Sequence, residues 1–129
     1  MGKRIAIVGT RFTRLHSQKW IDQIQEFIDA LPPDTEVFTG GAPGTDLTAA
    51  ECARERGLKV HVLFPDAQYS QDARFFVHQN RSIVGDADEV HAFWDGLSAG
   101  THHAIQLARF LKIPLHVHYI HVDDWDARK

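Results

Sequence analysis

The chain has 129 residues, 43% of them hydrophobic and 24% charged, which fits one soluble domain with a core of its own. Its formal net charge is −3 with the histidines neutral, whereas domains that bind nucleic acid along an extended surface usually carry a basic excess. We therefore do not expect nucleic acid as a partner. Cys52 is the single cysteine, so an intrachain disulfide is excluded.

The sequence shows neither a secretory signal nor a run that could cross a membrane. The apolar run at residues 5–8 is far too short to span a bilayer, and polar residues follow it. We therefore expect a cytoplasmic protein that has no membrane partner.

Short apolar runs alternate along the chain with stretches of helical periodicity. In chain order, strands are predicted over residues 4–8, 36–39, 58–64, 89–94 and 114–119. Helices are predicted between them, over residues 20–31, 45–56, 73–84 and the stretch that carries Ala104, Ile105, Ala108 and Leu111 on one face. Pro32 and Pro33 stop the first helix, and Gly57 is placed to end the second. A loop is predicted over residues 65–70.

This alternation predicts a single Rossmann-like α/β domain of three layers, with a mostly parallel sheet of about five strands and right-handed crossovers. We assign residues 1–121 to the domain and residues 122–129 to a polar tail. In such sheets, ligands bind beyond the carboxyl ends of the strands, where the strand order reverses. If the first strand is central, with the second and fourth beside it, the turns that follow these three strands meet at that point.

The turn after the second predicted strand reads Gly40-Gly41-Ala42-Pro43-Gly44-Thr45-Asp46 and opens a helix. Glycine-rich backbone at a helix N-terminus can bring several N–H groups to an anion, so this turn predicts a phosphate cradle, with Asp46 accepting from a ribose hydroxyl. The alternative is a tight turn in which Thr45 or Asp46 only caps the helix. The turn is neither a P-loop nor a G-x-G-x-x-G motif, so a standard NAD site is not expected.

A second turn, Asp95-Gly96-Leu97-Ser98-Ala99-Gly100-Thr101, follows the fourth predicted strand. The hydroxyl and N–H groups of Ser98, Gly100 and Thr101 suit a second phosphate contact, and Asp95 suits a contact to a base or a ribose. A simple helix cap is again the alternative. Two such turns in one small domain predict one pocket for a nucleotide or a nucleotide-like sugar phosphate.

Two further positions are candidates for the same pocket. Arg11, in the turn Gly9-Thr10-Arg11, could hold a phosphate through its planar guanidinium, or could lie in solvent. Asn80 could face the pocket from the third predicted helix, where helical spacing prevents Arg74, Gln79 and Asn80 from all pointing inward. The candidate ligand-binding residues are Gly9, Thr10, Arg11, Gly40, Gly41, Ala42, Gly44, Thr45, Asp46, Asn80, Asp95, Gly96, Ser98, Gly100 and Thr101.

The chain has nine histidines, which raises the question of a metal site. His116 and His118 share a face of the last predicted strand, and His121, Asp123 and Asp124 follow. No cysteine assists them and their spacing matches no standard site, so we expect no metal and no other cofactor.

Together these motifs resemble the SLOG superfamily. It contains DNA-processing proteins of the Smf/DprA type, the Lonely Guy cytokinin-activating phosphoribohydrolases, and small stand-alone bacterial and phage proteins, which are the most similar group. The resemblance rests on Val8-Gly9-Thr10-Arg11, Thr39-Gly40-Gly41-Ala42, Gly44, Asp46, Asn80, Ala87-Asp88, Ala92-Phe93-Trp94-Asp95-Gly96, Ser98, Gly100 and Thr101. It implies a Rossmann-like domain whose two glycine motifs frame a nucleotide-derived ligand, and it implies a homo-oligomer.

The chain departs from the hydrolytic members of that superfamily. Lonely Guy enzymes carry P-G-G-x-G-T-x-x-E with a catalytic glutamate, and Ala104 stands where that glutamate would be. The helical arginine of those enzymes falls on Gln79 here. These differences speak against phosphoribohydrolase activity by the family's mechanism.

Our main expectation is therefore a protein that binds, and could sense, a nucleotide or a nucleotide-derived sugar phosphate. The enzymatic alternative is N-glycosidic hydrolysis of a nucleoside monophosphate, in which Asp46 or Asp95 would act as the catalytic carboxylate. A second alternative is single-stranded DNA binding in the manner of DprA.

Overall fold

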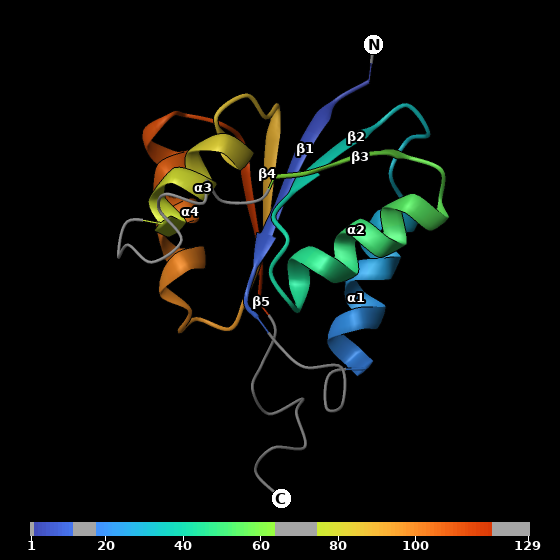
Figure 1. Ribbon diagram of the computed structural model, residues 1–129, viewed down its shortest axis with the longest axis horizontal. Coiled ribbons are helices and arrows are strands. Elements are labelled where there is room, and N and C mark those ends of the chain that lie inside the picture. The colour runs from blue at the N-terminus through green and yellow to red at the C-terminus, as the bar shows by residue number, and fades with distance from the viewer. Residues whose placement is uncertain (1, 12–17, 64–74, 120–129) are drawn as a thin grey trace, which may run out of the picture.

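The computed structural model describes residues 2–11, 18–63 and 75–119. Its strands are β1 (Arg4–Gly9), β2 (Glu36–Thr39), β3 (Lys59–Val62), β4 (Glu89–Trp94) and β5 (Leu115–Tyr119). All neighbouring strands are parallel, and their order across the sheet is β3-β2-β1-β4-β5 (Figure 1). β1 is central, with β2 and β4 beside it, so the strand order on which the predicted pocket depends is confirmed.

The helices of the described ranges cover both faces of this sheet. They are α1 (Gln18–Asp29), α2 (Thr45–Glu55), α3 (Phe75–Val84) and α4 (Ala99–Phe110). α1 and α2 lie together on one face, and α3 and α4 lie on the other (Figure 1). The three layers and the parallel sheet confirm the predicted Rossmann-like α/β class. None of these helices is both long and apolar enough to span a bilayer.

Side chains of β1 alternate between the two faces of the sheet and contribute to two separate hydrophobic cores. Ile5 and Ile7 pack toward α1 and α2, in a cluster with Trp20 and Ile24, while Ala6 and Val8 pack toward α3 and α4. All of these side chains are buried. A strand that is covered on both faces needs apolar residues at every position, which explains the unbroken apolar run in the sequence.

The ends of the elements differ slightly from the predictions. α1 ends at Asp29, before the two prolines, and β5 begins at Leu115 rather than at Pro114. Gly57 adopts a φ of 77° after α2, and Leu58 N–H donates to the Ala53 carbonyl at 3.0 Å, which confirms Gly57 as the residue that ends this helix. The predicted loop 65–70 and the polar tail 122–129 lie outside the described residues.

Candidate functional site

Thr10, directly after β1, is hydrogen-bonded to the end of β4, to the turn that follows β4 and to the start of α2. Its backbone N–H donates to the Phe93 carbonyl at 2.9 Å, and its hydroxyl accepts from the Asp95 N–H at 3.2 Å. Its own carbonyl accepts from the backbone N–H of Thr45 at 3.3 Å and from the Thr45 hydroxyl at 2.9 Å. A Cβ on the preceding Gly9 would lie 2.5 Å from the Phe93 carbonyl oxygen, so only glycine fits between these elements.

A cavity of about 350 Å³ opens at this meeting point. Of the predicted ligand-binding residues, those that line it are Gly9, Thr10, Arg11, Ala42, Asp46, Asn80, Ser98, Gly100 and Thr101. The predicted residues that do not line it are Gly40, Gly41, Gly44, Thr45, Asp95 and Gly96. Val8, Gln79 and Ile83 also line it, and the two apolar residues among these were missed because their periodicity marks them only as core.

The first glycine turn joins the start of α2 to the end of β1. α2 begins at Thr45 with Gly44 as its N-cap, so neither Thr45 nor Asp46 is the capping residue that the alternative interpretation expected. The N–H of Thr45 donates to the Thr10 carbonyl, and the N–H of Leu47 donates to the Ala42 carbonyl at 3.2 Å. The turn therefore fixes the start of α2 beneath the cavity, with Ala42 and Asp46 as the residues that reach the cavity wall.

Asp46 is a buried acid in that wall, with 8% of its surface exposed. Burial raises the pKa of its carboxyl from 3.8 to about 7, against the opposing effects of the Ala42 N–H, the Arg11 charge and the Thr39 hydroxyl. A Cβ on Gly40 would lie 2.6 Å from the Asp46 Oδ2 atom, so the absence of a side chain at Gly40 leaves room for the carboxyl. The cavity therefore contains a group that can hold or release a proton near neutral pH.

The Asp95 side chain accepts hydrogen bonds from the backbone of its own turn, the second glycine turn. Its Oδ1 atom accepts from the N–H groups of Leu97 at 2.8 Å and Ser98 at 2.9 Å. The carboxylate thus holds the turn together and lies outside the cavity lining. Gly96 supports the same turn with a φ of 85°.

The first turn of α4 faces the cavity. Ser98 is the N-cap residue, but its side chain makes no capping hydrogen bond and instead donates from Oγ to Thr101 Oγ1 at 3.1 Å. The first N–H groups of a helix have no partner within the helix, so this uncapped turn can donate to an anion. Asn80 holds the turn in place, because its Nδ2 atom donates to the Gly100 carbonyl at 2.9 Å.

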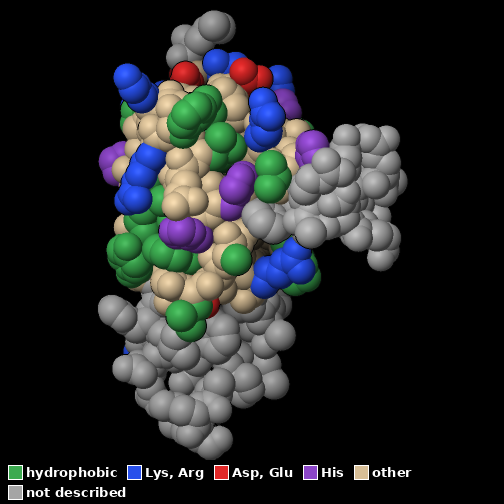
Figure 2. Space-filling model, turned by 90° about the vertical axis from the view of Figure 1, so that its left-hand side faces the viewer, with side chains coloured by type: hydrophobic (Ala, Val, Ile, Leu, Met, Phe, Trp, Pro, Cys, Tyr) green, Lys and Arg blue, Asp and Glu red, His purple; other side chains and the backbone are tan. Residues whose placement is uncertain are grey.

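Charge is distributed unevenly between the two helical layers. α1 and α2 each contain three acidic residues and one basic residue, whereas α3 and α4 contain no acidic residue and one arginine each. The face that α3 and α4 cover shows Lys, Arg and His side chains and few acidic ones (Figure 2). Arg11 is exposed at the cavity. The net negative charge of the chain therefore does not describe the surface beside the cavity.

An aromatic surface adjoins the cavity through Ser98. The Ser98 carbonyl accepts from the Trp94 Nε1–H at 3.1 Å and from the His102 N–H at 3.1 Å. The Trp94 ring is stacked with the exposed His102 ring at 5.6 Å between centroids, and Tyr119 lies 5.9 Å from Trp94 with 59% of its surface exposed. Trp94, His102 and Tyr119 form what we call the aromatic surface.

Comparison with known proteins identifies the fold. No protein-family model and no curated protein matches the sequence. DNA processing protein A from Helicobacter pylori has a TM-score of 0.67 at 23% identity, over 98% of this chain and 69% of that one. DNA processing protein A (DprA) from Streptococcus pneumoniae has a TM-score of 0.59 at 18% identity, over 95% of this chain and 60% of that one. The chain thus shares the Rossmann-like fold of DprA proteins and spans roughly two thirds of their length.

The same comparison corrects one expectation. The Helicobacter pylori protein binds single-stranded DNA, which contradicts the expectation that a chain of this kind has no nucleic-acid partner. The net charge is a poor guide to the surface of α3 and α4, because the acidic excess of the helices lies on α1 and α2. α3 and α4 contain no acidic residue that would repel a phosphate backbone, whereas α2 contributes Asp46 to the cavity wall.

Proposed function

We propose that the chain binds single-stranded DNA, with one phosphate of the strand in the cavity and neighbouring bases on the aromatic surface. The observation that carries this proposal is the position of Ser98. This residue belongs to the cavity lining and to the uncapped start of α4, and its carbonyl holds Trp94 of the aromatic surface. A phosphate subsite and a stacking subsite are therefore adjacent, which is how proteins bind single strands without reading their sequence.

The phosphate would be held by backbone and hydroxyl donors together with one cation. The N–H groups of the first turn of α4 lie at the positive end of the helix dipole, and the hydroxyls of Ser98 and Thr101 lie beside them. Arg11 adds a guanidinium to the lining from the end of β1. Charged donors of this kind make short hydrogen bonds with phosphate oxygens.

The bases would stack on side chains rather than be read by hydrogen bonds. Tyr119 and His102 are exposed and lie next to the half-buried Trp94, which fixes the surface in place. Stacking of one base on an aromatic side chain contributes about 1–3 kcal/mol in single-strand binding. The fold similarity to a protein that binds single-stranded DNA supports the same function.

A second candidate is the binding of a free nucleotide or sugar phosphate in the same cavity. Arg11 is the single cation among the described lining residues, which suits one phosphate group better than a long polyanion. Asp46 would then face the ligand with a pKa of about 7, where a carboxyl can act as a general acid. The hydrolytic alternative therefore depends on Asp46, because Asp95 is outside the lining.

Fluorescence anisotropy with a labelled oligo-dT strand tests the proposal. We expect saturable binding that weakens as salt is raised, with Arg11→Gln reducing affinity and the slope against salt by about one counterion. Arg54→Gln is the matched control, because Arg54 is also an exposed arginine but lies in the last turn of α2 on the opposite layer. Binding of a mononucleotide without binding of the strand would favour the second candidate. No binding of either at low salt would overturn both.

A further inference from the structure

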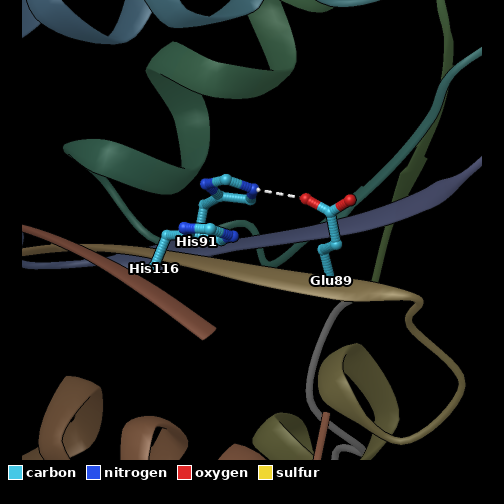
Figure 3. Close-up of side chains that lie close together, drawn as sticks. All are labelled: Glu89, His91 and His116. Carbon is cyan, nitrogen blue, oxygen red and sulfur yellow. Dashed lines mark hydrogen bonds and ion pairs between the residues drawn. The ribbon is translucent and has the colours of Figure 1, made fainter. Parts of the chain in front are cut away.

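A cluster of two histidines and a glutamate lies on the other face of the sheet, away from the cavity. Glu89 and His91 are two residues apart on β4, so both point to the face that α1 and α2 cover. His116 is the direct partner of His91 on the neighbouring strand β5. Parallel pairing thus brings three potential metal ligands from two strands to one place (Figure 3).

One distance within the cluster is close to that between two ligands of a metal ion. The His91 Nε2 atom lies 3.1 Å from the Glu89 Oε1 atom, and the three ligand atoms all lie within 4.8 Å of one another. Zinc bonds of about 2.1 Å in a tetrahedral site place ligand atoms roughly 3.4 Å apart. The His116 ring lies nearly parallel to the His91 ring at 4.7 Å between centroids, so a small rotation of the exposed His116 would complete the set.

Two of the three groups also have an outer partner. The His91 Nδ1 atom lies 3.0 Å from the His118 Nε2 atom, and Lys3 Nζ donates to the Glu89 Oε2 atom. Metal-bound histidines usually donate their second ring N–H to a neighbouring acceptor, which fixes the tautomer, and metal-bound carboxylates are usually hydrogen-bonded as well. His118 is such a partner for His91, and Lys3 is such a partner for Glu89.

The cluster has an inner and an outer side. His91 is 6% exposed, with Phe27 from α1 at 4.4 Å between ring centroids. His116 is exposed on the edge strand, and its ring nitrogens make no hydrogen bond to another described residue. An ion could therefore approach from the His116 side, while His91 and Glu89 are already held against each other.

We propose that Glu89, His91 and His116 bind a divalent transition-metal ion of the zinc class. Imidazole and carboxylate ligands suit Zn²⁺ and Co²⁺. Three protein ligands leave a fourth position for water. The site could not be found from the chain alone, because the pattern pairs His116 with His118 on one strand and does not show which residues of β4 lie opposite them.

Calorimetric titration of the tag-free full chain with ZnCl₂ tests the proposal. We expect one equivalent bound by the natural sequence, and a loss of affinity of at least about tenfold in His116→Ala and in Glu89→Gln. His61→Ala is the matched control. His61 also lies on an edge strand and also pairs with a glutamate, because its Nε2 atom is 2.9 Å from the Glu36 Oε1 atom. Among the described residues, no third potential metal ligand joins that pair.

Co²⁺ provides a second measurement that does not depend on stability. Visible absorption of bound Co²⁺ should appear with the natural sequence and with His61→Ala, and should be lost in His116→Ala, whose exposed position makes misfolding an insufficient explanation. The proposal is overturned if the natural sequence binds no metal. It is also overturned if His116→Ala and Glu89→Gln bind as well as the control, since the cluster would then serve only as packed and hydrogen-bonded side chains.

Discussion

The backbone N–H and the hydroxyl of Thr45 both donate to the carbonyl oxygen of Thr10, at 3.3 and 2.9 Å. Thr45 is the first residue of α2, and Thr10 directly follows β1. The pair therefore joins the start of a helix to the end of the central strand. The Thr10 hydroxyl also accepts a hydrogen bond from the Asp95 N–H. Thr10 therefore sets the spacing of the turns around the cavity.

Replacing Thr45 by valine should lower the free energy of unfolding by about 1 kcal/mol, since it removes one buried hydrogen bond. The cost stays near that value because the Thr10 carbonyl keeps the backbone N–H of Thr45 as a donor. Thr48→Val is the matched control, a buried threonine of the same helix whose hydroxyl makes no hydrogen bond to another described residue. Urea denaturation measures both variants, and equal losses would show that the Thr45 hydroxyl has no special role.

Asp46 should make stability fall as pH rises. Its carboxyl has a pKa of about 7 in the folded chain against an ordinary value of 3.8, so between these values the folded state holds a proton that the unfolded state has lost. The contribution of Asp46 to the free energy of unfolding should therefore decrease from about pH 4 to about pH 7, by roughly 4 kcal/mol at most, and level off above that.

The Asp46→Asn variant isolates this contribution from the other titrating groups. The difference in unfolding free energy between the natural chain and the variant should shift in favour of the variant as pH rises from about 4.5 to about 8, as measured by urea denaturation at each pH. A difference that stays constant over this range would mean that Asp46 ionises in the folded chain at its ordinary pKa.

The order of the elements and the meeting of the turns could be predicted because the signals for them are local. Apolar runs, helical spacing and glycine turns each lie within a few residues, and the crossover rule then limits the topology. The roles within the turns could not be predicted in the same way. Whether Asp95 faces a ligand or closes its own turn depends on the backbone path, and sequence spacing permits both.

The contacts between side chains of β4 and β5 were the hardest features to predict from the sequence. Trp94 approaches Tyr119, and His91 approaches His116, only because β4 and β5 pair in one particular register. A shift of β5 by one residue would turn His116 and Tyr119 to the opposite faces of the sheet. The aromatic surface and the Glu89 cluster therefore required the structure, although every residue in them was visible in the chain.

Lys112 is a position where glycine should stabilise the chain. It has a φ of 59° just after α4, and Ile113 N–H donates back to the Ala108 carbonyl at 3.0 Å, the same arrangement that Gly57 makes after α2. A side chain in this left-handed conformation costs about 1 kcal/mol or more. Lys112→Gly should therefore raise the free energy of unfolding by about 0.5–1 kcal/mol, after the greater freedom of glycine in the unfolded chain is subtracted.

The reciprocal change, Gly57→Ala, should lower it by about 1 kcal/mol, because a Cβ there meets no other atom and only the conformation is strained. Urea midpoints of the two variants give the comparison. If Lys112→Gly were destabilising while Gly57→Ala behaved as expected, the Lys112 side chain would have to make a stabilising contact that outweighs its strain.

Tyr119 tests the aromatic surface separately from the phosphate subsite. Tyr119→Ala should weaken oligo-dT binding by roughly five- to a hundredfold, the equivalent of one lost stacking contact, and should leave the slope of affinity against salt unchanged, because no charge is removed. Tyr119→Phe should retain affinity, since stacking needs the ring and not the hydroxyl. Phe110→Ala is the matched control, an aromatic side chain with 81% of its surface exposed at the far end of α4. If Phe110→Ala and Tyr119→Ala weakened binding equally, bases would not be stacked beside the cavity, and the strand would have to follow another path over the α3 and α4 layer.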